Sequence, residues 1–163
     1  MPAAYYVETG ALLKRYRREP GSAVVDELLE ARRPDELLLT SQWTLVECKA
    51  VATRLLKGRE LRRSQYERLI ARLFEDLASY GVRVLPIEAS LLAEALDLYP
   101  QFSLRAPDAL HLLSAVRFQR TFEPASFYLV TGDHEIGDAA RAHGIEVIDP
   151  EAASALEGLR RST

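Results

Sequence analysis

Hydrophobic residues along this chain fall into short runs that alternate with longer segments, where they recur every three or four residues. The short runs are typical of buried strands and lie at 5–7, 37–40, 82–87, 127–131 and 146–148. The segments with helical spacing are 9–16, 22–32, 43–56, 64–80, 89–99, 107–118, 134–143 and 151–159. Thr9 is a possible N-cap of the first of these helices.

Short apolar strands separated by helices favour a parallel sheet covered by helices on both faces. We therefore expect an α/β fold in three layers, α/β/α, with a short central parallel sheet of the Rossmann-like kind. The length of 163 residues suits a single domain spanning 1–163. Ligands of such sheets bind at the carboxyl ends of the strands, so polar side chains at those ends are candidate functional residues.

Composition excludes several classes of protein. Hydrophobic residues make up 48% of the chain, which argues against disorder, and the lone Cys48 rules out a disulfide framework within the chain. No apolar run approaches the roughly 20 residues needed to span a bilayer, and the first residues lack the pattern of a signal peptide. We expect a cytoplasmic protein that makes no use of a membrane. The net charge of −3 does not by itself indicate nucleic-acid binding.

Two acidic residues directly follow predicted strands. Glu8 comes after the first strand, and Asp133 comes shortly after the strand at 127–131. Each also has a purely structural explanation. A carboxylate near a helix N-terminus is favourable, and aspartate is among the best N-caps.

Two further acids lie within apolar rows of predicted helices. Glu47 stands between Trp43 and Val51 at four-residue spacing, and Asp108 stands between leucines in the same way. A carboxylate in an apolar row needs a partner to offset its desolvation. That partner is either a metal ion or an arginine, such as Arg15 or Arg54 for Glu47.

Several carboxylates in one crevice repel one another unless a cation joins them. Mg²⁺ and Mn²⁺ prefer oxygen ligands and keep water in their remaining positions. Such a metal can activate a water molecule and stabilise charge on a phosphate. The acids therefore indicate phosphodiester hydrolysis.

The motifs carrying these acids resemble those of PIN domains, and among them the VapC-type toxins of toxin–antitoxin pairs. The resemblance rests on YYVETGALLKRY at 5–16, PGS at 20–22, TLVE at 44–47, LRAPDALHL at 104–112, LVTGD at 129–133 and GIEVIDP at 144–150. The third acidic motif, around Asp108, is the most specific. Together the motifs span nearly the whole chain in order.

The resemblance implies a metal-dependent endoribonuclease that cleaves single-stranded RNA. It assigns both catalysis and binding of Mg²⁺ or Mn²⁺ to four acids, which are Glu8, Glu47, Asp108 and Asp133. It makes Thr9 a supporting hydroxyl. It also implies a VapB-like antitoxin as protein partner and a homodimer.

Two positions depart from the family pattern, because the first acid is Glu8 where aspartate is usual and Gly10 replaces a small polar residue. One alternative is therefore a catalytically weakened or inactive PIN-like domain that binds RNA or a protein. A nucleotide-binding or phospho-acceptor domain is a third possibility, although no glycine-rich phosphate loop follows the first strand. Weaker signals are His111, His134, Glu135, Asp138 and two basic runs at 14–18 and 59–63, either of which could hold RNA phosphates.

Overall fold

The computed structural model describes residues 2–99, 101–156 and 159. Its central sheet has five parallel strands in the order β3-β2-β1-β4-β5. Their bounds are β1 Ala4–Val7, β2 Leu37–Ser41, β3 Arg83–Leu85, β4 Phe127–Val130 and β5 Glu146–Ile148. Tyr6 is in register with Leu39 on one side and Leu129 on the other. The carboxyl ends of the strands consequently meet at one edge of the sheet.

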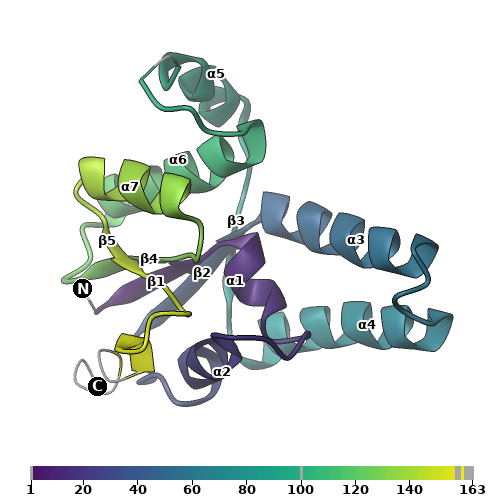
Figure 1. Cartoon of the computed structure of the whole chain (residues 1–163). Helices are drawn as coiled ribbons and strands as arrows, with labels where there is room; N and C mark the ends of the chain where they lie inside the picture. Colours follow the sequence, from purple (N-terminus) through teal and green to yellow (C-terminus); the bar gives the residue numbers. More distant parts are fainter. Residues whose placement is uncertain (1, 100, 157–158, 160–163) are drawn as a thin grey trace.

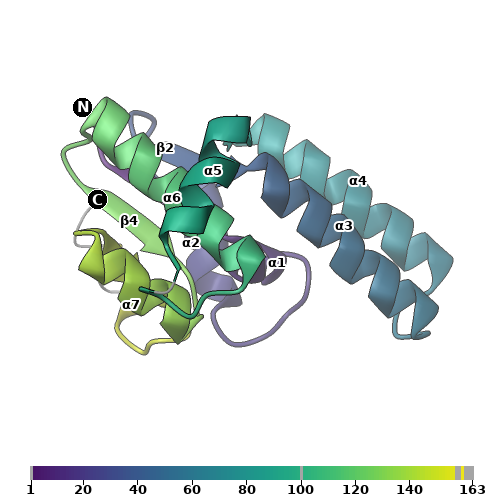
Figure 2. The same cartoon turned by 90° about the horizontal axis from the view of Figure 1, so that it is seen from above.

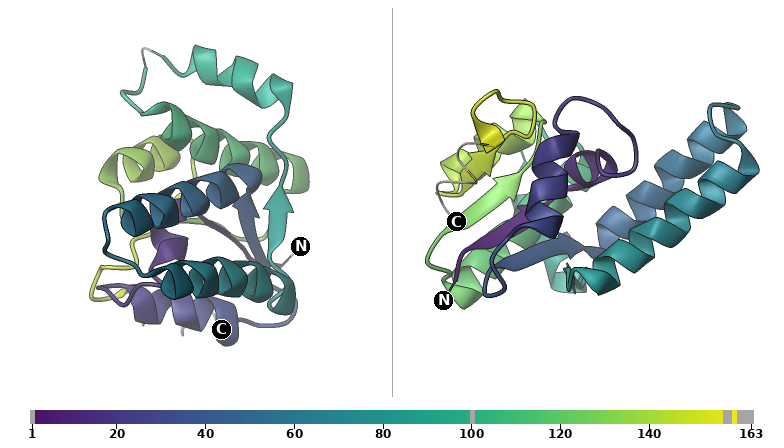
Figure 3. Two further views of the ribbon diagram at one scale, coloured as in Figure 1. Left: turned by 90° about the vertical axis from the view of Figure 1, so that its right-hand side faces the viewer. Right: turned by 90° about the horizontal axis from the view of Figure 1, so that it is seen from below.

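Helices cover both faces of this sheet (Figure 1). Their bounds are α1 Thr9–Leu13, α2 Ser22–Glu30, α3 Gln42–Lys57, α4 Arg63–Ser79, α5 Ala89–Asp97, α6 Ala106–Phe122 and α7 His134–Ala142. α6 and α7 cover one face, while α1 and α2 cover the other. α3 and α4 run side by side and project away from the sheet (Figures 2 and 3).

Alternation along the strands produces two separate cores. In β1, Tyr6 packs with the α6 and α7 side, whereas its neighbour Tyr5 packs with α2 on the opposite side. In β2, Leu39 likewise packs on the α6 and α7 side, and Leu38 packs on the α2 side. Because successive side chains of a strand point to opposite faces, a short continuous apolar run supplies both cores. This confirms the expected three-layer α/β/α architecture with a parallel sheet.

The structure corrects several predicted boundaries. The first helix ends at Leu13 and continues only as a turn, and its N-cap is Glu8, so the assignment of Thr9 as cap was wrong. α6 runs four residues further than expected, to Phe122. Of the predicted helix 151–159, residues 151–154 form turns and bends, Ala155 and Leu156 are helical, and residues 157–158 lie outside the described part. Across the described ranges, no helix is long and apolar enough to cross a membrane.

Candidate active site

A cleft opens where the order of the strands reverses, at the carboxyl ends of β1 and β4. β2 and β3 follow β1 on one side, and β4 and β5 lie on its other side, which makes this position the switch point where α/β folds bind ligands. The cleft has a volume of about 440 Å³. The four acids that the sequence singled out all line it, together with Glu19 and Glu151; the four are Glu8, Glu47, Asp108 and Asp133. They come from the ends of β1 and β4 and from α3 and α6.

Glu8 caps the helix that it precedes. Its Oε2 accepts a hydrogen bond from the backbone N–H of Gly10 at 2.6 Å, and its Oε1 accepts one from Ala11 at 2.8 Å. The hydroxyl of Thr131 donates a longer bond to Oε1 at 3.3 Å. Burial raises the pKa of the Glu8 carboxyl, although these hydrogen bonds and the nearby His111 oppose the rise. Glu8 therefore interacts with the N-terminus of α1, as its structural explanation proposed, and it also lines the cleft.

Glu47 takes its partners from α1 and α6. Thr9 donates its hydroxyl hydrogen to Oε2, and Nε2 of His111 lies 2.7 Å from the same oxygen. Burial favours a higher pKa, but the hydrogen bonds from His111 and Thr9, together with the charges of His111 and Arg105, outweigh it and lower the pKa of Glu47. The arginines suggested as partners, Arg15 and Arg54, do not make these bonds, so those two suggestions were wrong.

His111 is held in turn by Tyr6. The Tyr6 hydroxyl lies 2.9 Å from Nδ1 of the ring, and His111 itself is 1% exposed. Burial raises the pKa of the Tyr6 phenol, which keeps it protonated and able to donate. A ring with its hydrogen on Nε2 can then accept from Tyr6 and donate to Glu47. The spacing of His111 one turn after Asp108 was the sequence signal for this residue, which contacts the site directly.

Asp108 and Asp133 face one arginine. Nε of Arg105 lies 2.8 Å from Oδ2 of Asp108, and a terminal guanidinium nitrogen lies 3.8 Å from Oδ2 of Asp133. The Asp108 side chain is 7% exposed, whereas that of Arg105 is 74% exposed. Arg105 thus supplies positive charge between two acids from the solvent side of the cleft. Sequence reasoning did not identify it.

Asp133 also caps a helix, as its structural explanation anticipated. Its Oδ1 accepts hydrogen bonds from the backbone N–H groups of Glu135 and Ile136, at 2.8 and 3.2 Å. Its Oδ2 is the atom that faces Arg105. One carboxylate oxygen therefore fixes the side chain to α7, and the other is presented to the cleft.

The cleft is also lined by an ion-pair group whose lysine, Lys14, belongs to the first basic run noted in the sequence. Nζ of Lys14 lies 2.6 Å from Glu151 and 3.2 Å from Glu19. These hydrogen bonds raise the pKa of Lys14 against the opposing effect of burial. Glu151 comes shortly after β5. The criterion that singled out Glu8 and Asp133, an acidic residue soon after a predicted strand, therefore applied to Glu151 as well.

Most of the weaker candidates lie away from the cleft. Arg15, from the first basic run, is engaged with Asp26, Glu30 and Asp76. His134 and Glu135 are not buried in the site, and Asp138 pairs with Arg141 on α7.

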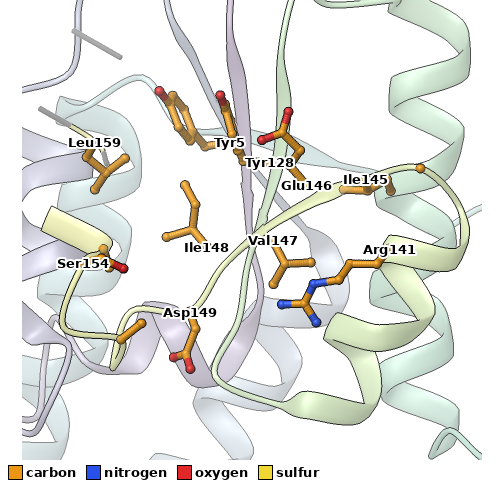
Figure 4. Close-up of a pocket in the computed structure, with 13 residues that line it drawn as sticks. Tyr5, Tyr128, Arg141, Ile145, Glu146, Val147, Ile148, Asp149, Ser154 and Leu159 are labelled. Atoms are coloured by element: carbon orange, nitrogen blue, oxygen red, sulfur yellow. The ribbon is translucent and has the colours of Figure 1, made fainter. Parts of the chain in front are cut away.

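A larger cavity, of about 870 Å³, lies along β5 (Figure 4). It is lined by Tyr5 and Tyr128, whose rings stack, and by Arg141, Glu146 and Asp149. None of the four predicted acids lines it. Its mixture of charges and apolar groups gives no indication of hydrolytic chemistry.

The four acids suit a hard divalent cation by their chemistry, since every donor is a carboxylate oxygen and all face one open cleft. In the described part of the chain, no three Asp, Glu, His or Cys side chains stand together as a ready metal-binding group. The internal partners explain this, because Glu8 is turned to backbone N–H groups, Glu47 to His111 and Asp108 to Arg105. Arg105 already supplies positive charge to Asp108 and Asp133, and its exposed side chain has room to turn away from a metal.

Comparison with known proteins places the chain in a family. The family model described as "PIN domain" matches residues 5–142. Ribonuclease VapC46 from Mycobacterium tuberculosis is 31% identical over 148 residues, which cover 91% of this chain and 98% of that protein.

Solved structures with the same fold include two VapBC complexes. VapBC2 from Rickettsia felis, bound to a DNA fragment from its promoter, aligns with a TM-score of 0.61 and 14% identity over 88% of this chain and 96% of that one. VapBC-1 from nontypeable Haemophilus influenzae gives a TM-score of 0.60 and 18% identity over 91% of this chain and 99% of that one. At these identities the likeness concerns the fold. The family model, which matches most of the chain, and the ribonuclease relative show that this chain belongs to the PIN-domain family.

Proposed function

We propose that this chain is a VapC-type toxin, an endoribonuclease that cleaves single-stranded RNA with Mg²⁺ or Mn²⁺ held by Glu8, Glu47, Asp108 and Asp133. One observation carries the proposal: four carboxylates from four separate elements line one cleft at the switch point of the sheet. The relative named as a ribonuclease, alignable over nearly its whole length, supports the reaction class.

Glu8, Glu47, Asp108 and Asp133 would hold the divalent metal, which when bound would provide an activated water and positive charge near the scissile phosphate. The chain's own residues prepare the site. Thr9 and His111 keep Glu47 ionised and fix its orientation, and Oδ1 of Asp133 is held by α7 while Oδ2 stays available. Arg105 stands at the open side of the cleft, where its guanidinium can turn from Asp108 to a phosphate of the RNA.

The proposed protein partner is a VapB-like antitoxin. Two of the structures with this fold are named as VapBC complexes, which supports a protein partner of this kind. The proposed site of action is the cytoplasm, where RNA is the substrate. The homodimer implied by the family resemblance stays a prediction, which the mass of the purified protein in solution tests.

A catalytically silent PIN-like domain that binds RNA or protein is the second candidate. It is favoured by the internal partner that each acid already has, most of all by the Arg105–Asp108 ion pair. The two candidates differ in whether the acids act on RNA.

Cleavage of a mixed single-stranded RNA with Mn²⁺, with Mg²⁺ and with EDTA tests the proposal. We expect cleavage that requires metal and that Asp108→Asn lowers by about a hundredfold or more, since this variant keeps the shape of the ligand but removes its charge. Asp138→Asn is the matched control, because Asp138 is an exposed aspartate on α7 outside the cleft. Equal cleavage by the wild type and Asp108→Asn in clean preparations would overturn the mechanism.

A further inference from the structure

Gly10 lies directly against the carboxylate of Glu8. A Cβ atom built on Gly10 would stand 2.9 Å from Oε1 and 3.4 Å from Oε2 of Glu8. The first distance is shorter than carbon and oxygen atoms tolerate without bonding. Any side chain at position 10 therefore requires the Glu8 carboxylate to move.

Movement of the Glu8 carboxylate would break the hydrogen bonds that hold it. Oε2 accepts from Gly10 N–H, and Oε1 accepts from Ala11 N–H and from the Thr131 hydroxyl. Glu8 is also 7% exposed, so an oxygen displaced from these donors finds little water to replace them. The end of a glutamate side chain is normally adaptable, but here each of its oxygens is held.

The fold-back over Gly10 accommodates the additional methylene. Aspartate, asparagine, serine and threonine are the usual side chains that cap a helix from this position, because their short side chains reach the first N–H groups directly. Glutamate is one methylene longer and must bend back to reach the same donors. It bends into the space that a side chain at position 10 would fill.

We infer that Glu8 and Gly10 form a coupled pair, in which the missing side chain at position 10 allows a glutamate to serve as the first acid of the cleft. Gly10 is thus a positioning residue for the Glu8 carboxylate. The two departures from the family pattern are then a single structural adjustment. The part of this inference that concerns metal binding rests on the proposed function, whereas the coupling itself does not.

A double-mutant cycle in EDTA tests the coupling without metal or RNA. The four proteins are the wild type, Gly10→Ala, Glu8→Asp and the double variant, compared by melting temperature. Gly10→Ala should lower the melting temperature by about 2–4 °C in the presence of Glu8. In the Glu8→Asp background it should leave the melting temperature unchanged or raise it, because alanine favours a helix over glycine and the clash is gone.

Gly137→Ala is the matched control for a glycine inside a helix. Its Cβ would meet Arg141 at 3.5 Å and Val147 at 3.6 Å, which are ordinary contacts. We expect the same effect of Gly137→Ala whether residue 8 is glutamate or aspartate. If Gly10→Ala does not fold but the double variant does, the coupling is demonstrated in its strongest form.

Additive effects of the two changes would overturn the inference, as would failure to fold of both proteins that carry the Gly10→Ala change. Titration with Mn²⁺ separates this result from the proposed function. Weaker Mn²⁺ binding by Gly10→Ala, restored about tenfold or more in the double variant, supports the pair as part of a metal site. If the melting temperatures show coupling but none of the four proteins binds Mn²⁺, the inferred Glu8–Gly10 pair stands and the proposed metal site is wrong.

Discussion

Nε2 of His111 lies 2.7 Å from Oε2 of Glu47, which ties α6 to α3. The two residues are 64 positions apart in the chain, so only the packing of the two helices brings them together. His111 is buried while Glu47 is partly open to solvent. The histidine therefore anchors a carboxylate whose remaining surface faces the cleft.

Replacing His111 by alanine should weaken the fold and the site together. Glu47 loses the histidine bond and the Tyr6 hydroxyl loses its acceptor on the ring, which costs about 1–3 kcal/mol of unfolding free energy. Cleavage should fall about 10–100-fold, the range seen when a residue that orients a metal ligand is removed. Urea unfolding and RNA cleavage measure the two effects, and His134→Ala at the start of α7 is the control. Unchanged unfolding of His111→Ala would contradict the contact.

Glu8 and Glu47 should respond to pH in opposite directions in the metal-free protein. The pKa of Glu8 is raised above its ordinary value of 4.5, so its ionisation destabilises the fold progressively as pH rises above 4.5. The pKa of Glu47 is lowered, so its contribution is present above 4.5 and is lost as pH falls through the folded-state pKa.

Melting temperatures of Glu8→Gln and Glu47→Gln across the acidic and neutral pH range, each relative to the wild type, check this prediction. As pH rises, the melting temperature of Glu8→Gln should increase relative to that of the wild type. The melting temperature of Glu47→Gln should decrease relative to that of the wild type. Curves that shift in the same direction for both variants would show that the two environments do not differ as described.

Removing Arg105 should strengthen metal binding. Arg105 shares Asp108 and Asp133 with any incoming cation, so Arg105→Ala frees both carboxylates. We expect Mn²⁺ to bind severalfold more tightly by calorimetric titration. The unfolding free energy without metal should change by no more than about 1 kcal/mol, because the guanidinium is exposed. Arg141→Ala, outside the cleft, is the control, and weaker Mn²⁺ binding by Arg105→Ala would contradict competition.

Arg15 should matter for stability and not for RNA. It joins Asp26, Glu30 and Asp76, and its guanidinium also lies 5.7 Å from the centre of the Tyr80 ring. Arg15→Ala leaves the largely buried Asp76 without its cation and should lower the unfolding free energy by about 3 kcal/mol. Arg17→Ala, two positions along and nearer the surface, should change it by less than about 0.5 kcal/mol. Urea unfolding compares the two, and equal effects would contradict an internal role for Arg15.

The periodicity of apolar residues was sufficient to predict the strands, most of the helices and the three layers, although not the helix expected over 151–159. Strands such as 37–40 and helices such as 64–80 follow from spacing alone, because a buried face imposes its period on the local sequence. The parallel sheet followed from the alternation of the two kinds of element, and it brings the residues after β1 and β4 to one edge. Glu8 and Asp133 could therefore be placed near each other before any coordinates were known.

Tertiary structure alone decided the long-range partners in and around the site, such as His111 for Glu47. The contacts of His111 with Tyr6, of Glu47 with His111 and of Lys14 with Glu151 join positions 105, 64 and 137 residues apart. No local period encodes such pairs, because they depend on how the helices pack on the sheet. Likewise, Glu8 and Gly10 are only two positions apart in sequence, but it is the fold-back of the Glu8 side chain over Gly10 in the structure that shows their coupling. Local sequence determines which surfaces are buried, and three-dimensional packing determines which polar groups meet there.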